Sequence, residues 1–425
     1  MNMYVFYSFL LFVYLLIYIP VYFVRIKLLR GESLFLRDRL GRKLKDEGTQ
    51  NKSLWIHAVS VGEVLSLQNL IKKIKERYPE WIIHFSTLTN TGMRVAKEKL
   101  TGADNIFFVP LDFKHVVRKF FSTLRPKVFV LAESELWPNL LREAKKQTKG
   151  VLLINGRISS RSFKRYSRFK FVAKKILKNI NLFLVQTEKD KENLERIGVN
   201  SGVVEVVSNL KSEINLPILT EEDLLKLKNN LSIPATNRVI VAGSTRKGEE
   251  KELIEAYSRA KSVDENLLLI LAPRHPERFD EVERICKDFT FKVMRRTQVS
   301  PNKQWDILIL DTIGELAHFY ALSDVSFVGG SLVPWGGQNL LEPAFYKKPI
   351  FFGPHMENFA YLAEKFIQSG AARIIAKNKD LDEMFLIRDE KSLEKMGKRA
   401  KETLNSLQGA TEKTIKAIEG MMANS

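Results

Sequence analysis

The chain has 425 residues, 45% of them hydrophobic and 28% charged, which excludes a disordered or fibrous protein and predicts two globular domains rather than one. The single cysteine, Cys286, excludes an internal disulfide and indicates a reducing compartment, and the six histidines show no metal-ligand spacing. The net charge of +19 favours an anionic partner, which could be nucleic acid, a negatively charged membrane or an anionic substrate.

The first predicted element is an apolar segment at the N-terminus. Residues 1–24 carry no charged side chain, and residues 4–24 are almost wholly apolar and aromatic. Roughly 20 apolar residues cross a bilayer, and the segment lacks the early positive charge and the small-residue cleavage site of a signal peptide. Basic residues follow from Arg25, Lys27 and Arg30 onward, which places the later residues on the cytoplasmic side. The segment therefore predicts a membrane anchor that spans or dips into the bilayer, with a buried helix of a soluble protein as the alternative.

Beyond residue 50, short apolar runs alternate with helical stretches. The runs in the first half lie at residues 54–58, 81–85, 106–109, 128–132, 151–154 and 182–185. The stretch between the first two runs has apolar residues at helical spacing. This alternation is typical of a parallel α/β sheet, in which ligands bind at the carboxyl ends of the strands.

Two loops in the first half place carboxylates after predicted strands. Glu63 follows the first strand in the string HAVSVGE, where it could take a proton from a hydroxyl nucleophile. The alternative is that Glu63 stabilises a helix dipole in the first turn. Glu133 and Glu135 follow the fourth strand and could bind a sugar or a basic group, with capping and a salt bridge as the alternative.

A basic segment with aromatic side chains follows at residues 157–178. It holds nine basic residues, interleaved with Phe163, Tyr166, Phe169 and Phe171, and no acidic residue follows until Glu188. Such a segment favours contact with a membrane surface or a phosphorylated lipid. Nucleic acid and a plain solvated helix face are the alternatives, and the predicted anchor makes nucleic acid the less favoured of the partners.

The α/β pattern restarts after a polar stretch at residues 215–237 that carries Pro217 and Pro234. New strands are predicted at residues 239–242, 267–272, 307–310, 325–328 and 349–352. The sequence thus predicts an anchor at 1–24, a first domain at 25–214 and a second at 215–425. The last twenty residues predict an amphipathic helix, and packing of this helix back on the first domain is an alternative.

Polar and basic side chains follow the later predicted strands as well. Lys211 ends the strand before the linker, where an ammonium group could offset developing negative charge. The string Gly243-Ser244-Thr245-Arg246 could form an anion nest, and Arg274 could make a bidentate contact with phosphate or carboxylate. Gly314 and Glu315 open another predicted helix.

The string VGGSLVPWGGQNLLEP at residues 328–343 is the most informative in the chain. Its glycine pairs, 329–330 and 336–337, permit positive φ and close approach to a ligand. A helix beginning just beyond such a loop offers unpaired N–H groups to an anion. Asn339 and Glu342 are three apart, so we expect them on one helix face, where they could read sugar hydroxyls. A surface loop with a well-placed N-cap is the alternative.

Several other motifs are missing or uninformative. The chain has neither a G-x-x-x-x-G-K-[ST] phosphate loop nor a strand-borne G-x-G-x-x-G, which disfavours ATPase and dehydrogenase activities. Its D-x-D spacing, Asp380 and Asp382, lies in a charged stretch and indicates the start of a helix rather than a metal site.

Taken together, the motifs resemble those of the Kdo (3-deoxy-D-manno-octulosonic acid) transferases of Gram-negative lipopolysaccharide synthesis. The resemblance runs from the N-terminus to about residue 370. The matching strings are HAVSVGE at 57–63, ESELWPNL at 133–140, NGRIS at 155–159, SNLK at 208–211, PRHPERF at 273–279, GEL at 314–316, VGGSL at 328–332, GGQNLLEP at 336–343 and GPHMENF at 353–359. The loop around Trp335, the lysine-rich stretches and the loosely matching segment at 32–41 depart from the family pattern.

The resemblance implies a GT-B glycosyltransferase, with two Rossmann-like α/β domains facing across a cleft and an N-terminal membrane anchor. It implies an inverting, metal-independent enzyme without a cofactor, placed on the cytoplasmic side of the inner membrane. The reaction would move Kdo from CMP-Kdo to the 6′-hydroxyl of a lipid A precursor, lipid IVA. The first domain would take the lipid and the second the CMP-Kdo, with no nucleic-acid partner.

The resemblance also implies roles for particular residues. Glu63 would be the general base, and Glu133 and Lys211 would support the transition state. The positions that match CMP contacts of the family are Pro273, Arg274, Gly314, Glu315, Leu316, Asn339, Leu340, Leu341 and Glu342. The glycine loop and the predicted nest add Ser244, Gly330 and Gly337 as further candidate donor contacts.

Two alternatives differ in what they predict. Another membrane-associated GT-B transferase would use a UDP-sugar and a lipid acceptor. A membrane-tethered nucleic-acid-binding protein would show an affinity that falls steeply with salt, and it would give no role to Glu63 or to the glycine loop.

Overall fold

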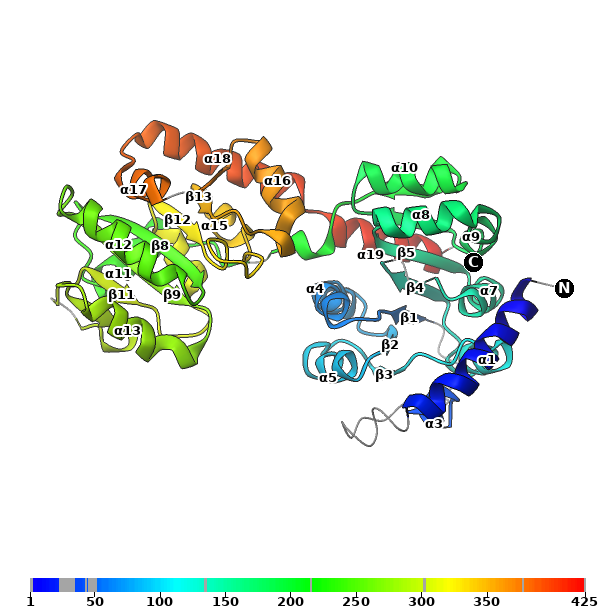
Figure 1. Ribbon diagram of the computed structural model, residues 1–425. Helices are drawn as coiled ribbons and strands as arrows, with labels where there is room; N and C mark the ends of the chain where they lie inside the picture. The colour runs from blue at the N-terminus through cyan, green and yellow to red at the C-terminus, as the bar shows by residue number, and fades with distance from the viewer. Residues whose placement is uncertain are drawn as a thin grey trace. The chain divides into compact units, whose positions relative to one another are not determined.

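The computed structural model describes residues 3–22, 35–42, 44, 52–133, 136–214, 216–300, 303–376 and 378–423 (Figure 1). The chain divides into two compact units. Unit 1 comprises Met1–Glu213 and Gln408–Ser425, and unit 2 comprises Ile214–Leu407. The predicted second domain ran to residue 425, whereas the structure assigns the last helix to unit 1. Ser134, Glu135 and the predicted basic residues Arg25, Lys27 and Arg30 lie outside the described residues.

Unit 1 is built on a parallel sheet of seven strands in the order β3-β2-β1-β4-β5-β6-β7. Its strands are β1 (Ser53–His57), β2 (Ile82–Thr87), β3 (Asn105–Phe108), β4 (Val128–Ala132), β5 (Gly150–Gly156), β6 (Leu182–Val185) and β7 (Val204–Val206). The register pairs Leu54 of β1 with Ile83 on one side and with Val128 on the other. Because the strand order reverses between β1 and β4, their carboxyl ends flank the topological switch point, where α/β sheets bind ligands.

Helices accompany these strands, and most of them connect one strand to the next. They are α1 (Met3–Tyr22), α3 (Leu36–Arg39), α4 (Val61–Arg77), α5 (Asn90–Lys99), α6 (Lys114–Leu124), α7 (Pro138–Gln147), α8 (Ser160–Arg168), α9 (Lys170–Leu177), α10 (Glu188–Ile197) and α19 (Ala410–Ala423). Leu54 and Ile56 join a core on one face of the sheet together with apolar residues of α4, while Trp55 joins a second core on the other face. Alternate strand residues thus enter opposite layers, as a parallel sheet covered on both faces requires.

The last helix, α19, completes the first of these cores. Ile415 and Ile418 are fully buried in the same cluster as the apolar stripe of α4, and Figure 1 shows α19, in red, beside β5. The Glu213 carboxylate accepts hydrogen bonds from the backbone N–H groups of Gly409 (2.9 Å) and Thr411 (3.0 Å). Unit 1 is therefore closed by a segment that follows unit 2 in the sequence.

Helix α1 lies against unit 1 along one side. The Ser8 hydroxyl accepts a hydrogen bond from Asn139 (3.1 Å), the Tyr4 hydroxyl accepts one from Asn179 (3.2 Å), and Tyr7 hydrogen bonds to Asp112. Within the described part of the chain, no helix is long and apolar enough to cross a membrane, so the predicted anchor over residues 1–24 is not supported.

Unit 2 is built on a second parallel sheet, with the order β10-β11-β9-β8-β12-β13-β14. Its strands are β8 (Arg238–Thr245), β9 (Leu267–Pro273), β10 (Val293–Arg295), β11 (Ile307–Ile309), β12 (Val325–Val328), β13 (Ile350–Phe352) and β14 (Ala372–Ile374). Its helices are α11 (Glu221–Asn230), α12 (Glu249–Lys261), α13 (Phe279–Lys287), α14 (Leu316–Leu322), α15 (Leu341–Phe345), α16 (Ala360–Gln368), α17 (Asn378–Leu386) and α18 (Glu390–Ser406). The strand order reverses between β8 and β12, so the carboxyl ends of these strands flank the switch point of unit 2.

The predicted α/β class with two parallel sheets is confirmed. The strand predicted before the linker is β7, but it ends at Val206 and not at Lys211, which lies in a short 3₁₀ turn. The sequence missed β10 and β14, and each is three residues long and lies at an edge of its sheet. An edge strand is covered less than a central one, so it carries no long apolar run for the sequence to reveal.

Candidate active site

Glu63 lies at the start of α4, directly beyond the carboxyl end of β1. Its carboxylate accepts hydrogen bonds from the Ser60 hydroxyl (2.8 Å) and from the backbone N–H of Val59 (2.8 Å). In return, the N-cap Ser60 accepts a bond from the backbone N–H of Glu63 (3.3 Å). Ser60 therefore caps α4, and the Glu63 side chain reaches back to the residue before the cap. Glu63 is 7% exposed, and its carboxylate is held in one orientation at the switch point.

Lys211 and Glu133 meet near the start of α4. The Lys211 Nζ atom lies 3.5 Å from Glu133 Oε1, and both side chains are partly exposed. The same ammonium group is 3.8 Å from the point where a β-carbon on Gly62 would lie. Glu133 follows β4 with a left-handed φ of 57°. The structure thus brings together the three predicted catalytic positions of unit 1, with the ammonium group beside the turn that carries Glu63.

A chain of amide side chains supports Lys211. Asn155, at the end of β5, accepts a hydrogen bond from the backbone N–H of Leu210 through Oδ1 (3.1 Å). The Asn155 carbonyl accepts a bond from Gln186 (2.9 Å), and Gln186 in turn accepts one from Asn209 (3.0 Å). These bonds fix the turn at residues 209–211, which sequence reasoning could not place because its partners come from β5 and from the residue after β6.

His57 ends β1 beneath this site. Its Nδ1 lies 2.9 Å from the Ser86 hydroxyl and 3.1 Å from the Ser86 carbonyl, and the side chain is fully buried. Burial lowers the pKa of His57 to about 4, because the charged imidazolium would lose its hydration. A neutral His57 therefore packs under the loop that leads to Glu63.

In unit 2, the first of the predicted donor residues lie at or beyond the carboxyl ends of β8, β9 and β11. Pro273 is the last residue of β9, and the exposed Arg274 donates its backbone N–H to the carbonyl of Thr245 (3.0 Å). Ser244, near the end of β8, has a left-handed φ of 56°. Gly314 precedes α14 with φ 92°, and open space surrounds its α-carbon on the side where a β-carbon would lie.

Glu315 and Leu316 mark the start of α14. The Glu315 carboxylate forms a salt bridge with Arg296 (3.3 Å) and accepts a hydrogen bond from the Thr312 hydroxyl. Leu316 is half-buried. Glu315 is therefore oriented by two neighbouring side chains.

The glycine loop after β12 depends on its glycines. Gly330, Gly336 and Gly337 have φ values of 68°, 84° and 77°, which side-chain-bearing residues rarely adopt. At position 329 a glycine is required for a different reason, because a β-carbon on Gly329 would lie 2.6 Å from the α-carbon of Thr245. The close approach predicted for Gly329 is thus to the backbone of β8, the neighbouring strand.

The N–H groups of this loop already hold an anion, which is the carboxylate of Glu249. Gly330 donates to Glu249 Oε2 (2.6 Å), and Ser331 and Leu332 both donate to Oε1 (2.8 Å each). Glu249 is fully buried, and burial raises its pKa while the backbone N–H groups oppose that rise. Gly330 was predicted to contact the donor. Its backbone N–H group instead bonds to Glu249, so this N–H group does not bind the donor.

Asn339 and Glu342 do not share a helix face as predicted. Helix α15 begins only at Leu341, and Asn339 precedes it and accepts a hydrogen bond from the backbone N–H of Leu341 (3.1 Å). Leu340 and Leu341 are buried in the core of unit 2. Burial raises the pKa of Glu342, and the nearby positive charge of Arg274 opposes that rise, which shows that these two predicted donor residues lie within electrostatic reach of each other.

Arg246 links three loops of unit 2. The sequence had indicated it only as part of the predicted anion nest at residues 243–246. Its guanidinium lies over the Trp335 ring, 5.1 Å from the centroid, and contacts the His275 ring. Arg246 follows β8, His275 follows β9 and Trp335 follows β12, so only the folded sheet brings them together. No spacing in the sequence predicts this contact.

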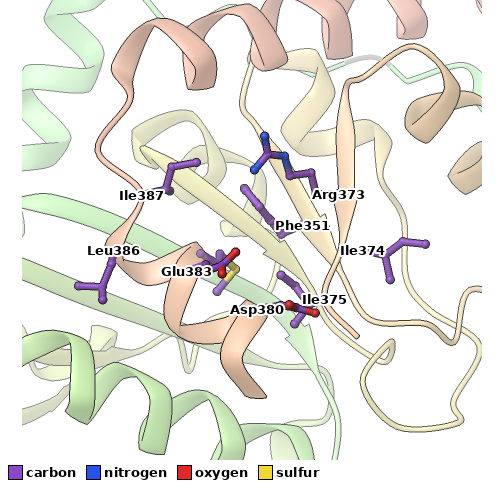
Figure 2. Close-up of a pocket in the computed structure, with 9 residues that line it drawn as sticks. Phe351, Arg373, Ile374, Ile375, Asp380, Glu383, Leu386 and Ile387 are labelled. Atoms are coloured by element: carbon purple, nitrogen blue, oxygen red, sulfur yellow. The ribbon is translucent and has the colours of Figure 1, made fainter. Parts of the chain in front are cut away.

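A cavity of about 460 Å³ in unit 2 lies away from these predicted site residues. Figure 2 shows Asp380 and Glu383 of α17 beside Phe351 of β13 and Arg373 of β14. None of the predicted site residues lines this cavity. The cavity therefore does not mark the predicted donor site, which the strand ends at β8 and β12 mark instead.

Known proteins match this chain in sequence. Residues 35–214 match the family described as 3-deoxy-D-manno-octulosonic-acid transferase (kdotransferase). The 3-deoxy-D-manno-octulosonic acid transferase of Haemophilus influenzae is 31% identical over 417 residues, which cover 95% of this chain and 96% of that protein. The chain belongs to the Kdo transferase family. It is therefore a glycosyltransferase, and the resemblance seen in its motifs is confirmed.

Two further matches place this Kdo transferase among larger and more distant proteins. A bifunctional glycosyltransferase/methyltransferase of Fusobacterium nucleatum is 35% identical over 342 residues, or 79% of this chain, and the chain spans 52% of that protein's length. A solved glycosyltransferase from Rickettsia africae ESF-5 is 12% identical and matches 88% of this chain and 99% of its own, with a TM-score of 0.53. The second match shows that the Kdo transferase shares its fold of two parallel α/β sheets with a known glycosyltransferase.

Proposed function

We propose that this Kdo transferase moves Kdo from CMP-Kdo to the 6′-hydroxyl of a lipid A precursor, lipid IVA, with inversion and without a metal ion. One observation carries the proposal. In each unit, some of the predicted residues lie at the topological switch point of the sheet, Glu63 and Glu133 after β1 and β4, and the glycine loop after β12 beside β8. Switch points are where open α/β sheets bind their ligands.

On the acceptor side, Glu63 removes the proton of the attacking hydroxyl. Bonds from Val59 and Ser60 orient the Glu63 carboxylate, and an ionised carboxylate held in one orientation can accept a proton from a hydroxyl group. The hydroxyl oxygen then bonds to the anomeric carbon of Kdo while the bond from that carbon to the CMP phosphate oxygen breaks. Because attack and departure occur on opposite faces, the anomeric configuration inverts.

The nearby positive charge supports this step. Lys211 lies beside Glu133 and the start of α4, where an ammonium group stabilises negative charge that develops in the transition state. The Glu133 carboxylate lies 3.5 Å from this ammonium group and keeps a negative charge beside it. On the donor side, the exposed Arg274 offers a planar fork that suits the phosphate of CMP.

The proposal also places the enzyme at the cytoplasmic face of the inner membrane. Helix α1 contacts unit 1 through Tyr4, Tyr7 and Ser8, and its other side exposes Val5, Phe6, Phe9, Leu10, Phe12, Val13, Tyr14, Leu16 and Ile17. In the basic segment, Phe171 is 80% exposed and Phe169 is 59% exposed. Exposed apolar side chains beside basic ones favour an anionic lipid surface.

The direct test is a transfer assay with the full chain. The purified protein is incubated with CMP-Kdo and a tetra-acylated lipid A precursor. The masses of the lipid products are then measured by mass spectrometry. We expect a lipid heavier by the mass of one or more Kdo residues, together with release of CMP. Turnover of a UDP-sugar with no turnover of CMP-Kdo would replace the proposal with the alternative of a UDP-sugar-dependent lipid transferase.

A further inference from the structure

Two acidic residues at the start of α12 are buried without a role in the proposed chemistry. Glu249 and Glu250 are both fully buried, although glutamate is rarely found inside a protein unless it is paired. They are neighbours in sequence, so their side chains leave the helix in different directions. Each contacts a different loop at the carboxyl edge of the sheet in unit 2.

Glu249 holds the glycine loop. Besides the three bonds from residues 330–332, its carboxylate accepts a fourth from the backbone N–H of Arg246 (2.8 Å). A buried carboxylate with four N–H partners is well satisfied, whereas the four N–H groups, two of them buried and two partly buried, would each lose a hydrogen bond without it. Glu249 therefore fixes the turn after β12 against the turn after β8.

Glu250 holds the loop after β9. The Arg278 guanidinium donates to both of its carboxylate oxygens, at 2.6 Å and 3.1 Å, and a third bond from Arg278 reaches Glu281 (3.2 Å). The side chains of Glu250 and Arg278 are 1% and 12% exposed, so this bidentate pair is largely shielded from water. Arg278 is four residues beyond Arg274, in the same connection between β9 and α13.

The two held loops are bonded onward to the predicted CMP contacts. Gly337, two residues before Asn339, donates its N–H to the carbonyl of Gly330 (2.7 Å). Arg274 donates its N–H to Thr245, which adjoins the turn that Glu249 holds. A shift at the start of α12 would therefore move both Arg274 and the segment 339–342.

We propose that Glu249 and Glu250 are positioning residues for the donor site, which hold the loop of Arg274 and the loop of residues 339–342 in the geometry that binds CMP. This inference rests on the proposed function, because it takes CMP as the nucleotide of the donor. Neither residue touches the donor itself. Both act through the backbone of the loops that do.

The experiment compares Glu249→Gln and Glu250→Gln in the full chain with the wild type. The amide nitrogen of a glutamine at position 249 is a donor and would face N–H groups, and a glutamine at position 250 would leave Arg278 with one acceptor fewer. Glu252→Gln is the matched control, because Glu252 lies in the same first helical turn and is exposed. Glu249→Asp keeps the negative charge on a shorter side chain. It replaces Glu249→Gln in the measurements if Glu249→Gln does not fold.

Three readouts are needed. Calorimetry with CMP should show a dissociation constant raised about tenfold in each glutamine variant, the factor for one lost buried hydrogen bond, and unchanged in Glu252→Gln. In steady-state assays, the KM for CMP-Kdo should rise while the KM for the lipid stays as in the wild type. Hydrogen exchange should become faster in peptides covering residues 328–343 for Glu249→Gln and residues 273–279 for Glu250→Gln.

The outcomes separate the inference from the proposed function. Folded variants with wild-type CMP affinity, or with wild-type exchange in both loops, overturn the positioning role. Equal increases in both KM values also overturn it, because they indicate a general structural defect. A wild-type protein that binds no CMP overturns the proposed function and the CMP part of the inference, and the exchange measurement then reports separately whether the two residues hold the loops.

Discussion

The Glu63 carboxylate has an observed structural contact and a proposed chemical role, and two substitutions separate them. Glu63→Gln keeps the size of the side chain but cannot take a proton, so we expect the transfer rate to fall by roughly 10²- to 10⁴-fold. CMP affinity should stay unchanged, because the predicted CMP contacts all belong to unit 2. The measurement is single-turnover transfer beside CMP calorimetry.

Ser60→Ala is the control for Glu63. It removes the N-cap hydroxyl but leaves the carboxylate, so it should lower the free energy of unfolding by about 1 kcal/mol and retain most of the transfer activity. Near-normal turnover of Glu63→Gln would exclude Glu63 as the base. A loss of turnover in Ser60→Ala as large as in Glu63→Gln would indicate that the orientation of the turn matters more than the proton.

His57 predicts a pH dependence of stability. Its folded-state pKa is about 4, below its ordinary value of 6.5, so the unfolded chain binds a proton first as the pH falls. The free energy of unfolding of unit 1 should therefore decrease between pH 6.5 and pH 4, by about 3 kcal/mol from this residue, and this contribution should level off at lower pH. Above pH 6.5 it is fully present.

Denaturant titrations at several pH values test this expectation. His57→Gln should show a shallower pH dependence than the wild type over that window, whereas the exposed His115→Gln should keep the wild-type slope. Equal slopes for the wild type and His57→Gln would contradict the assignment of a neutral, buried imidazole.

At the scale of elements, helix α19 should stabilise unit 1 and leave unit 2 unaffected. Ile415 is fully buried in the core that α4 also lines, so Ile415→Ala should cost about 2–5 kcal/mol. We expect one transition in chemical denaturation to move to lower denaturant while the other stays in place. The exposed Lys416→Ala is the matched control, and a shift of both transitions would contradict the assignment of α19 to unit 1.

The elements differ in how far the sequence predicted them. Central strands such as β4 and β6 have the predicted bounds, because their apolar runs are buried on both faces. Helix α15 is only five residues long, so the assumption of a longer helix misplaced Asn339. A short helix leaves no periodic pattern, and its first residue is decided by what the loop before it contacts.

At the scale of the whole molecule, the excess of positive charge and the exposed side of α1 predict membrane binding. Deleting residues 1–24 should weaken co-sedimentation with anionic vesicles and leave unit 2 folded. The binding that persists through the basic segment should fall as salt rises, because salt screens attraction to anionic lipid.

Neutral vesicles and Phe171→Ser provide the controls for this experiment. The substitution removes an exposed aromatic ring of the basic segment and leaves α1 unchanged. Unchanged vesicle binding after the deletion would show that the basic segment, rather than α1, makes the main contact. Equal binding to neutral and anionic vesicles would contradict an electrostatic contribution.

The sequence by itself determined the α/β class, the two sheets, the Kdo transferase family and the positions of most candidate residues. These follow from local information, since apolar runs, glycine pairs and short motifs are each read within a few residues. Only the tertiary structure decided what the candidate residues contact. Glu249 lies 81 residues before Gly330, yet its carboxylate accepts a hydrogen bond from the Gly330 N–H group. Glu412 pairs with Arg77, which lies 335 residues earlier. Such contacts form where strand order and helix packing bring distant parts of the backbone together. Residues so far apart in the chain show no regular spacing from which the sequence could predict a hydrogen bond between them.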